Sequence, residues 1–575
     1  MIRRRRLLAV VAAVLIPLAL AVGPALFWRS PPLYGDPPRD GLTRVAGVLH
    51  VHTTLSDGTG SPEQVVRAGR EAGLSFLVIT DHNTNRAARS LEGYSGETLV
   101  LVGAELSTHQ GHLLGLGMRP STFPFAPDAL DALDDIRYLG GAAFAAHPAS
   151  PRDELAWSGW ELEGPWGLEV LNMDSLWRRA SWPTLLGGLV AYPFDPVYAL
   201  ARGLDRPAAA LARWDTLLAR RDVAGLASVD AHGSLIRWPE YLPELPSYGS
   251  LFRVLRTYVV LNAPLTKNAV RDAHAVRAAL AQGRSYMAME AIAPAGGFFF
   301  HAARGDRTWG MGDTIAPAPD LLLRAGGRLP RGARIELYRD GKRVAEGDGA
   351  LEFPARIPGA YRVETYLAGW DVPWVLSNPI YVHGAAEAAA RARRAEWPAA
   401  APPPVPARTL DAFEKGSRLA AEADAGTWVD PEVRVASERI PGAAAARLHF
   451  RFAEPRTDRS TIWGALVDRS HRDLSRDTGL LFDIKADGVY RVRVGLWEQR
   501  PGQAGDEPDW WLSTVRTSTT WRRVALPFER LHPAANNVDG TLDLRRVVGL
   551  VFHIDPATEE YFSEGKIWFD GLGAY

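Results

Sequence analysis

Residues 45–58 have the sequence VAGVLHVHTTLSDG, an apolar run that ends in two histidines and is followed closely by an aspartate. The apolar run predicts a buried strand with His50 and His52 at its end. In a strand, residues i and i+2 point to the same side, so both imidazoles can approach one metal ion. This stretch therefore predicts a strand that delivers metal ligands, with Asp57 as a further candidate.

A second histidine motif follows the next predicted strand. His82 lies in Thr80-Asp81-His82-Asn83, directly after another apolar run. Asp81 is better suited to orienting a ligand than to contacting a metal ion. The two motifs together place histidines at the ends of two successive strands.

Further histidines and carboxylates stand at or just beyond the ends of later predicted strands. They are Glu105, His112, His147, Asp230 and His232. Any single histidine is more often a structural residue than a ligand. Of the seven histidines between residues 45 and 290 other than His274, however, only His109 lies outside the set. Surface or core packing alone does not explain such a concentration at strand ends.

The region around these motifs alternates short β-rich runs with longer segments of helical character. The predicted strands are Val45–Leu49, Phe76–Thr80, Thr98–Gly103, Ala142–Ala146, Leu168–Leu171, Gly225–Val229 and Tyr258–Leu261. Seven strands in such a βα pattern predict a barrel. The segment Trp177–Leu204, rich in Leu, Trp and Pro, fits the pattern poorly. It is interpreted as an insertion, either near the mouth of the site or against a membrane surface.

The order of the candidate ligands resembles that of the PHP (polymerase and histidinol phosphatase) superfamily, whose members have a distorted (β/α)7 barrel. The match covers about residues 45–290 and implies metal ligands at His50, His52, Asp57, His82, Glu105, His112, His147, Asp230 and His232. The resemblance implies three ion sites, formed by His50, His52, Glu105 and Asp230, by Glu105, His112 and His147, and by Asp57, His82 and His232. The interval between Glu105 and His112 is shorter than in several relatives, which leaves His109 as an alternative ligand.

This donor set predicts a hydrolase. Imidazole and carboxylate donors without thiolate suit Zn²⁺, Mn²⁺ or Fe²⁺, and a carboxylate can bridge two ions. We therefore expect two or three divalent metal ions. Adjacent cations lower the pKa of a bridging water, supply hydroxide as nucleophile and stabilise charge on phosphoryl oxygens. The expected activity is hydrolysis of phosphomonoesters or phosphodiesters, with Glu105, Asp57, His82 and His232 taking part in catalysis.

Three arginines follow ligand motifs and could hold a substrate phosphate. They are Arg86, Arg89 and Arg152. A guanidinium presents a planar fork to phosphate oxygens, but a solvated surface charge is the commoner role for each.

Composition excludes several classes of site. The 575 residues include no cysteine, so disulfides, thiolate nucleophiles and Cys-based metal sites are ruled out. Lys and Arg number 65 against 66 Asp and Glu, a balance that gives no reason to expect a nucleic-acid partner. The length suggests three or four domains.

The first 30 residues predict export. Arg3–Arg6 form a basic cluster, and no charged side chain occurs from Leu7 to Trp28. Such a segment is long enough to span a bilayer with the basic end in the cytoplasm. A signal anchor is favoured over a cleaved signal peptide or a buried core helix. The remainder is then expected outside the cytoplasm, either membrane-anchored (periplasmic or at the cell surface) or secreted.

The domains expected after the 40–290 barrel are a small β-sandwich at 291–383, a linker at 384–408 and a larger β-sandwich at 409–575. The last region resembles galactose-binding-like jelly rolls. Trp510 and Trp511 could stack on sugar rings, although tryptophan in a sandwich is more often a core residue.

Two other functions remain open from the sequence. One is an exported glycan-binding surface protein whose metal site is structural. The other is a metal-dependent amide or lactone hydrolase, which would use the same activated water. For the favoured phosphoesterase, we expect a phosphorylated small molecule or envelope component as substrate.

Overall fold

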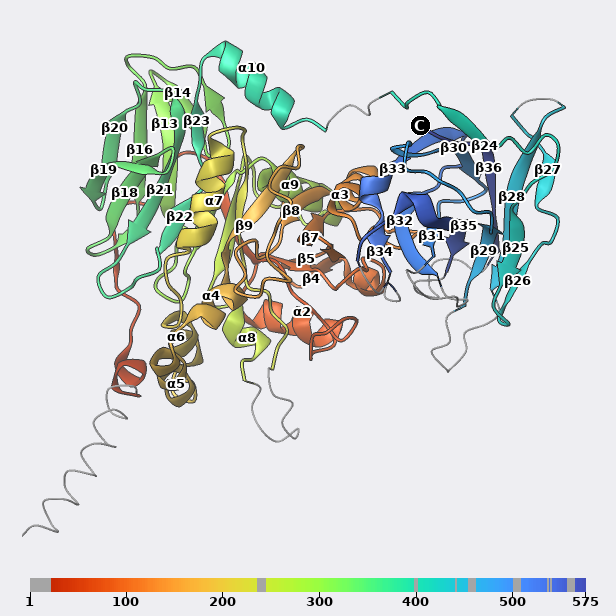
Figure 1. Cartoon of the computed structure of the whole chain (residues 1–575). Coiled ribbons are helices and arrows are strands. Elements are labelled where there is room, and N and C mark those ends of the chain that lie inside the picture. Colours follow the sequence, from red (N-terminus) through yellow and green to blue (C-terminus); the bar gives the residue numbers. More distant parts are fainter. Residues whose placement is uncertain are drawn as a thin grey trace, which may run out of the picture. The chain divides into compact units, whose positions relative to one another are not determined.

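The computed structural model describes residues 22–234, 245–397, 402–439, 442–452, 462–499, 508–534, 537, 540–555 and 564–575. The chain divides into two compact units (Figure 1). The first comprises Met1–Pro120 and Pro127–Pro398, and the second comprises Ser121–Ala126 and Ala399–Tyr575. The division after Pro398 falls within the linker that the sequence predicts.

The predicted hydrophobic anchor lies mostly outside the described residues. Of Leu7–Trp28, only residues 22–28 are described, and residues 22–27 are helical. No helix in the described ranges is long and apolar enough to cross a membrane.

Two sheets of the first unit contain the predicted barrel strands. In the larger sheet, β2 (Thr43–Val48), β3 (Phe76–Ile79) and β5 (Thr98–Val102) are parallel, and β11 (Arg256–Leu261) is antiparallel to β2. The smaller sheet has the order β10-β9-β8-β7-β6. Its strands are β6 (Ala104–Thr108), β7 (Gly111–Leu116), β8 (Ala142–Ala145), β9 (Trp166–Asn172) and β10 (Gly225–Ser228). Each of the seven predicted strands overlaps one of these.

The two sheets meet where their strands end. Isolated parallel bridges pair Val51 with Ala231 and His82 with Glu105. The antiparallel hairpin β6–β7 is missing from the predicted βα alternation, and it places two strands between β5 and the next helix. The described strands therefore form two sheets that isolated bridges join at the strand ends.

Helices pack against these sheets. They include α2 (Pro62–Glu71), α3 (Ala129–Tyr138), α7 (Ala208–Leu218) and α9 (Ala269–Ala281). Helix α2 begins where Ser61 Oγ accepts from Gln64 N and Gln64 Oε1 accepts from Ser61 N, a capping box. Such a cap stabilises a helix start by about 1 kcal/mol. Helix α9 buries Val276 and Leu280 in the same core as strand residues of both sheets.

The segment that fits the barrel pattern poorly forms three short helices. They are α4 (Met173–Arg179), α5 (Trp182–Ala191) and α6 (Pro196–Ala201), and α8 (Tyr248–Leu251) lies beside α6. Asn172, Ser181 and Asp195 cap the three starts through side-chain oxygens. The side-chain caps explain why so many short helices form in an apolar stretch.

The small sandwich shares a sheet with the barrel strands. Strand β12 (Ser285–Ala288) pairs with both β11 and β22 (Val375–Ser377), so the larger sheet continues into the sandwich. The remaining strands of that sheet are β4 (Gly93–Ser95), β15 (Thr314–Ile315), β18 (Arg334–Arg339), β19 (Lys342–Asp348), β21 (Gly359–Tyr366) and β23 (Ile380–Val382). The opposing sheet consists of β13 (Phe298–Arg304), β14 (Arg307–Gly310), β16 (Leu322–Gly327) and β20 (Leu351–Pro354).

A buried asparagine ties this sandwich to the smaller sheet. Asn378 Oδ1 accepts from Gly225 N at 2.7 Å, and its Nδ2 donates to Gly225 O at 2.9 Å and to Ser285 O at 3.0 Å. Helix α10 (Ala385–Arg394) then follows, within the range 384–408 that the sequence assigns to a linker.

The second unit is a sandwich of two antiparallel sheets. One contains β24 (Arg408–Asp411), β26 (Thr427–Val429), β27 (Arg434–Ala436), β28 (Ala444–Phe452), β30 (Gly479–Ala486), β33 (Arg522–Pro527) and β36 (Glu564–Ala574). The other contains β25 (Ala420–Ala423), β29 (Gly464–Asp468), β31 (Arg491–Glu498), β32 (Asp509–Arg516), β34 (His532–Pro533) and β35 (Val547–Ile554). Phe552 and Phe569, from opposite sheets, contact each other with ring centroids 4.4 Å apart, so one core serves both.

Candidate metal centre

The nine side chains that the sequence singles out lie in one cluster of the first unit. His50 and His52 directly follow β2, His82 follows β3, and His147 follows β8. Glu105 and His112 come from the hairpin β6–β7, and Asp230 and His232 follow β10. Asp57 lies on the loop after β2. All nine belong to groups whose ligand atoms lie within 4.8 Å of one another.

Glu105 occupies the centre of the cluster. Its Oε2 lies 3.0 Å from His50 Nε2 and 3.2 Å from His52 Nε2. Its Oε1 lies 2.8 Å from both His112 Nδ1 and His147 Nε2. His82 Nε2 lies 3.4 Å from the same Oε2 as His50 and His52. The two oxygens of one buried carboxylate thus face different imidazoles, which is the arrangement needed to bridge two ions.

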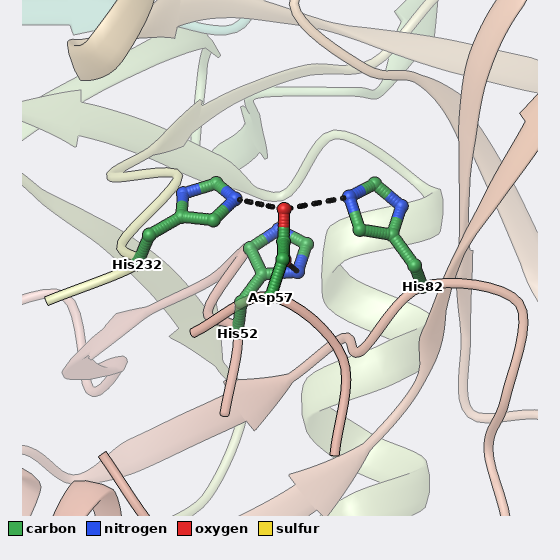
Figure 2. A group of neighbouring side chains, drawn as sticks. All are labelled: His52, Asp57, His82 and His232. Carbon is green, nitrogen blue, oxygen red and sulfur yellow. Dashed lines mark ion pairs between the residues drawn. The ribbon is translucent and has the colours of Figure 1, made fainter. Parts of the chain in front are cut away.

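Asp57 is the centre of a second group of donors, with His52, His82 and His232 around it (Figure 2). Its Oδ2 lies 3.2 Å from His232 Nε2 and 3.6 Å from His82 Nε2. Its Oδ1 lies 3.5 Å from His52 Nδ1. His52 therefore lies between Asp57 and Glu105, and one of its ring nitrogens faces each carboxylate.

Asp230 completes the side of the cluster nearest to His50 and His52. Its Oδ1 lies 3.3 Å from His50 Nε2 and 3.5 Å from His52 Nε2. The four side chains of the first predicted ion site, which include Glu105, are therefore adjacent.

The backbone at the strand ends adopts conformations that L-residues rarely use. His50 has φ 63°, His147 has φ 29° and Asp230 has φ 51°. Left-handed non-glycine residues cost about 1–3 kcal/mol each and cluster at functional sites. The i, i+2 alternation expected for His50 and His52 is thus not the reason that they converge, because His50 turns out of the extended conformation.

The donor atoms fit transition-metal ions. Among the described residues, Nε2 of His50 and both ring nitrogens of His52 have no hydrogen-bond partner, although they are buried. Buried polar atoms normally have one. Two ligands bound at about 2.1 Å with a tetrahedral angle lie about 3.4 Å apart. The separations of 3.0 and 3.2 Å from Glu105 Oε2 are close to that value.

The carboxylates and imidazoles strongly perturb one another. Burial alone would lower the pKa of His52, but Asp230 and Glu105 raise that pKa to about 9. Burial alone would raise the pKa of Glu105, yet His50, His112 and His147 hold it well below its usual range. The imidazoles around Glu105 therefore favour the ionised form of its carboxyl group.

Two acidic residues position the cluster from outside it. Asp81 accepts hydrogen bonds from Thr53 N at 2.7 Å and Ser56 Oγ at 2.7 Å. It therefore holds the loop that carries the candidate ligand Asp57. Glu169, which the sequence reasoning missed, lies 2.7 Å from His50 Nδ1 and accepts from His147 N at 2.6 Å. A glutamate inside the apolar run Leu168–Leu171 was the available signal.

His109, the alternative ligand, and the three arginines considered for phosphate binding differ in their positions relative to the cluster. His109 is exposed, whereas His112 reaches Glu105. Arg89 donates to Met118 O at 2.9 Å and forms an ion pair with Glu92. These two contacts hold its guanidinium group. Of Arg86, Arg89 and Arg152, only Arg152 lines the cavity at the cluster.

A cavity of about 410 Å³ adjoins the cluster. Besides the donors, its lining includes the charged Arg152, Asp174 and Arg178 and the apolar Met173, Trp177 and Leu200. Arg178 Nε donates to Asp174 Oδ2 at 2.6 Å, which fixes one guanidinium at the wall. The segment Trp177–Leu204 thus contributes to the mouth of the site.

Sequence comparisons relate the chain to three kinds of protein, while no family model matches it. It is 30% identical over 117 residues to an uncharacterized protein of Methanocaldococcus jannaschii, covering 18% of this chain and 67% of that protein. It is 35% identical over 119 residues to the 5'-3' exoribonuclease Rnm of Salmonella typhimurium (19% and 40%). It is 39% identical over 82 residues to phosphoribosyl 1,2-cyclic phosphate 1,2-diphosphodiesterase of Eggerthella lenta (12% and 30%). The chain spans less than half the length of the two enzymes.

Solved structures overlap with it at low scores. A two-domain protein of Bacteroides vulgatus containing a predicted PHP-like metal-dependent phosphoesterase covers 61% of this chain and 99% of its own, at 14% identity and TM-score 0.28. A family 11 carbohydrate-binding module of Clostridium thermocellum covers 29% of this chain and 93% of its own, at 18% identity and TM-score 0.24.

Proposed function

We propose that the chain is a metal-dependent phosphoesterase of the PHP superfamily and that its first unit hydrolyses phosphate esters at the cluster around Glu105. The observation that carries this proposal is the convergence of nine imidazoles and carboxylates, in which Glu105 Oε1 faces two imidazole nitrogens and Oε2 faces three.

The donors divide among the expected ions as the family pattern implies. His50, His52, Glu105 and Asp230 would hold one ion, Glu105, His112 and His147 a second, and Asp57, His82 and His232 a third. When bound, such ions lower the pKa of water and neutralise charge on phosphoryl oxygens. The distances from Glu105 and Asp57 to their neighbours support this division.

The chain itself supplies binding and orientation. Arg152 and Arg178 offer guanidinium groups on the cavity wall, where they would hold phosphate oxygens not engaged at the cluster. Asp174 holds Arg178 in place through the 2.6 Å hydrogen bond. Trp177, Met173 and Leu200 form an apolar wall that excludes water from the bound ester.

The test combines metal content with turnover. The purified full chain should bind two or three Zn²⁺, Mn²⁺ or Fe²⁺ ions and hydrolyse an aryl phosphomonoester or an aryl phosphodiester. Glu105→Gln should lose both properties, whereas Glu161→Gln, an exposed carboxylate, should keep them. The panel of substrates also includes oligoribonucleotides and cyclic phosphates. The proposal would be overturned if the fully metal-loaded chain hydrolysed none of them. Turnover of amides or lactones alone would favour the other hydrolase class.

For the second unit we propose glycan binding, because aromatic side chains collect on the outer face of its six-stranded sheet. Trp463 and His553 stack with ring centroids 5.7 Å apart, and Trp497 and Trp510 lie 5.1 Å apart. Trp511 points the other way into the core, where its Nε1 donates to Glu498. Of the two tryptophans named from the sequence, only Trp510 is therefore available to a sugar ring.

This second proposal is tested on soluble and insoluble polysaccharides. Trp510→Ala should weaken retention of the full chain by a polysaccharide, since aromatic faces stack on sugar rings. Trp428→Ala, an exposed tryptophan on the other sheet, is the matched control. Equal retention of both variants would contradict the assignment.

We also propose an extracytoplasmic location for both units. The support is the basic cluster Arg3–Arg6 followed by the uncharged stretch Leu7–Trp28. A C-terminal reporter that is active only after export should be active, and a cytoplasm-specific reporter should be silent. The opposite result would reject the location.

A further inference from the structure

An apolar stripe runs along α5 on the surface of the first unit. Trp182, Leu186 and Leu189 are 84%, 62% and 60% exposed. They are spaced four and three residues apart, so they lie on one face of the helix. Residues 182–194, WPTLLGGLVAYPF, contain no charged side chain. Soluble helices normally bury such a stripe, and contiguous exposed apolar surface marks an interaction site.

The opposite face of α5 is the one that packs against the protein. Ala191, nine residues after Trp182 and half a helical turn away in direction, is buried with Ala25 and Ala199. The hydroxyl of Tyr192 accepts from Ser247 N at 3.0 Å and lies 3.0 Å from Ser250 Oγ. Helix α5 is therefore fixed by its small-residue side, and the large apolar side chains point outwards.

The uncharged N-terminal stretch ends at this surface. Ala25, from the helical residues 22–27, packs on Ala191 and Ala199, and the Trp28 ring lies 5.3 Å from that of Tyr198. Phe27 is 80% exposed and adds to the apolar surface. Figure 1 shows this red helix beside α5 and α6. The chain segment best suited to lipid therefore leads directly into the stripe on α5.

The composition of the surroundings favours a bilayer over another protein. Tryptophan and tyrosine concentrate at membrane interfaces, and this surface carries Trp28, Trp182 and Tyr198. Arg29 is exposed at the end of the N-terminal helix and can meet anionic headgroups.

The same helices adjoin the metal-centre cavity. Met173, Trp177 and Arg178 of α4 line the cavity, as does Leu200 of α6. Only Ala180 and Ser181 separate α4 from α5. A bilayer in contact with the stripe would therefore lie next to a cavity that combines guanidinium groups with an apolar wall.

We infer that the stripe of Trp182, Leu186 and Leu189, extended by Phe27, docks on the lipid bilayer and presents the cavity to phosphate esters carried by lipids. The substrate part of this inference rests on the proposed phosphoesterase activity. The docking part does not, and the two are tested separately.

Docking is measured by site-directed spin labelling, for which a chain without cysteine is well suited. Leu186→Cys and the control Val270→Cys, 83% exposed on α9, are each labelled in the full chain and reconstituted in vesicles of phosphatidylcholine and phosphatidylglycerol. Contact with lipid raises the label's collisions with oxygen and lowers those with a water-soluble nickel complex. We expect this at residue 186 and not at 270.

Two results would overturn docking. Equal nickel accessibility at both positions would mean that the stripe faces water. A fall in collisions with both reagents at 186 would mean that protein, such as a second copy of the chain, covers it.

The substrate class is measured with two nitrophenyl phosphodiesters, one soluble and one carrying a diacylglycerol in the vesicles. Leu186→Glu with Leu189→Glu should cut hydrolysis of the lipid ester by about tenfold or more, since two apolar contacts are lost. The double variant should leave hydrolysis of the soluble ester unchanged. The control Val270→Glu should leave hydrolysis of both esters unchanged. Wild-type turnover of the soluble ester alone would overturn the lipid assignment, whereas turnover of neither would reject the phosphoesterase activity and leave docking to the label measurement.

Discussion

Nδ1 of His50 lies 2.7 Å from Oε1 of Glu169, and both side chains are fully buried. A carboxylate in this position fixes the orientation of the ring, leaving Nε2 directed at Glu105 and Asp230.

Glu169→Gln should therefore weaken metal binding by about 10–100-fold without removing a ligand. Competition with a chromophoric chelator measures the affinity, and Glu161→Gln is the surface control. Unchanged affinity in Glu169→Gln would show that the contact does not act on the metal site.

Removal of metal should destabilise the first unit. Ions held by the folded cluster add about 4 kcal/mol when their concentration is about 1,000 times Kd. A chelator should then lower the Tm of wild-type protein by several degrees. The variant His50→Ala with His52→Ala should unfold at the same temperature with and without chelator, and a chelator effect of wild-type size in that variant would place the ions elsewhere.

The loop that carries Asp57 depends on a glycine. A Cβ at Gly58 would lie 2.5 Å from the carbonyl oxygen of His52, so Gly58→Ala must shift one of these two segments. A displacement of about 1 Å at a site can reduce turnover by about 10²-fold. Steady-state kinetics measures the effect, and Gly384→Ala, where a Cβ meets no atom within 4 Å, should retain full activity.

Arg178 should act on substrate binding. Arg178→Ala should lower kcat/KM for a phosphodiester by about tenfold or more, and Arg178→Lys should recover only part of it, because lysine lacks the planar fork. The exposed Arg220→Ala is the control. Full recovery by lysine would show that charge alone is needed.

The second unit should lose stability in acid through Asp483. Burial alone would raise the pKa of this aspartate, but Arg523 and Arg439 hold it below its usual range. The ionised form is thus favoured by folding, so its contribution is complete above the pKa of the unfolded chain, near 4, and is lost as pH falls through the lower folded value.

Asp483→Asn should lower the Tm of the second unit at pH 7 and flatten its dependence on pH between about 5 and 3. Calorimetry of the full chain measures both. A Tm in Asp483→Asn that falls with acid as steeply as in wild type would assign the acid sensitivity to other groups.

The sequence predicted the seven barrel strands because each is an apolar run that ends in a turn or a polar motif. It did not predict the hairpin β6–β7, because Thr108-His109-Gln110-Gly111 is a weak turn signal inside a long apolar stretch. That hairpin brings Glu105 and His112 together, which accounts for their short separation in the sequence. It also shows why His112, and not His109, reaches the cluster.

The grouping of the nine side chains could be expected from motif order, but their supporting contacts could not. The left-handed φ of His50, His147 and Asp230 depends on tertiary structure, and no local pattern encodes it. Glu169 was missed because a charged residue in a strand was interpreted only as part of the strand. Trp510 and Trp511 were treated alike, although adjacent strand residues face opposite sides.

The pairing of β12 with β22 has a consequence for dissection of the protein. A chain that ends at the predicted boundary after residue 290 would leave the backbone amide and carbonyl groups on one edge of β12 unpaired. Such an edge can pair with strands of other molecules. The catalytic region is therefore expected to aggregate when expressed without residues 291–383, and its smallest soluble fragment should extend through the strand that closes this edge.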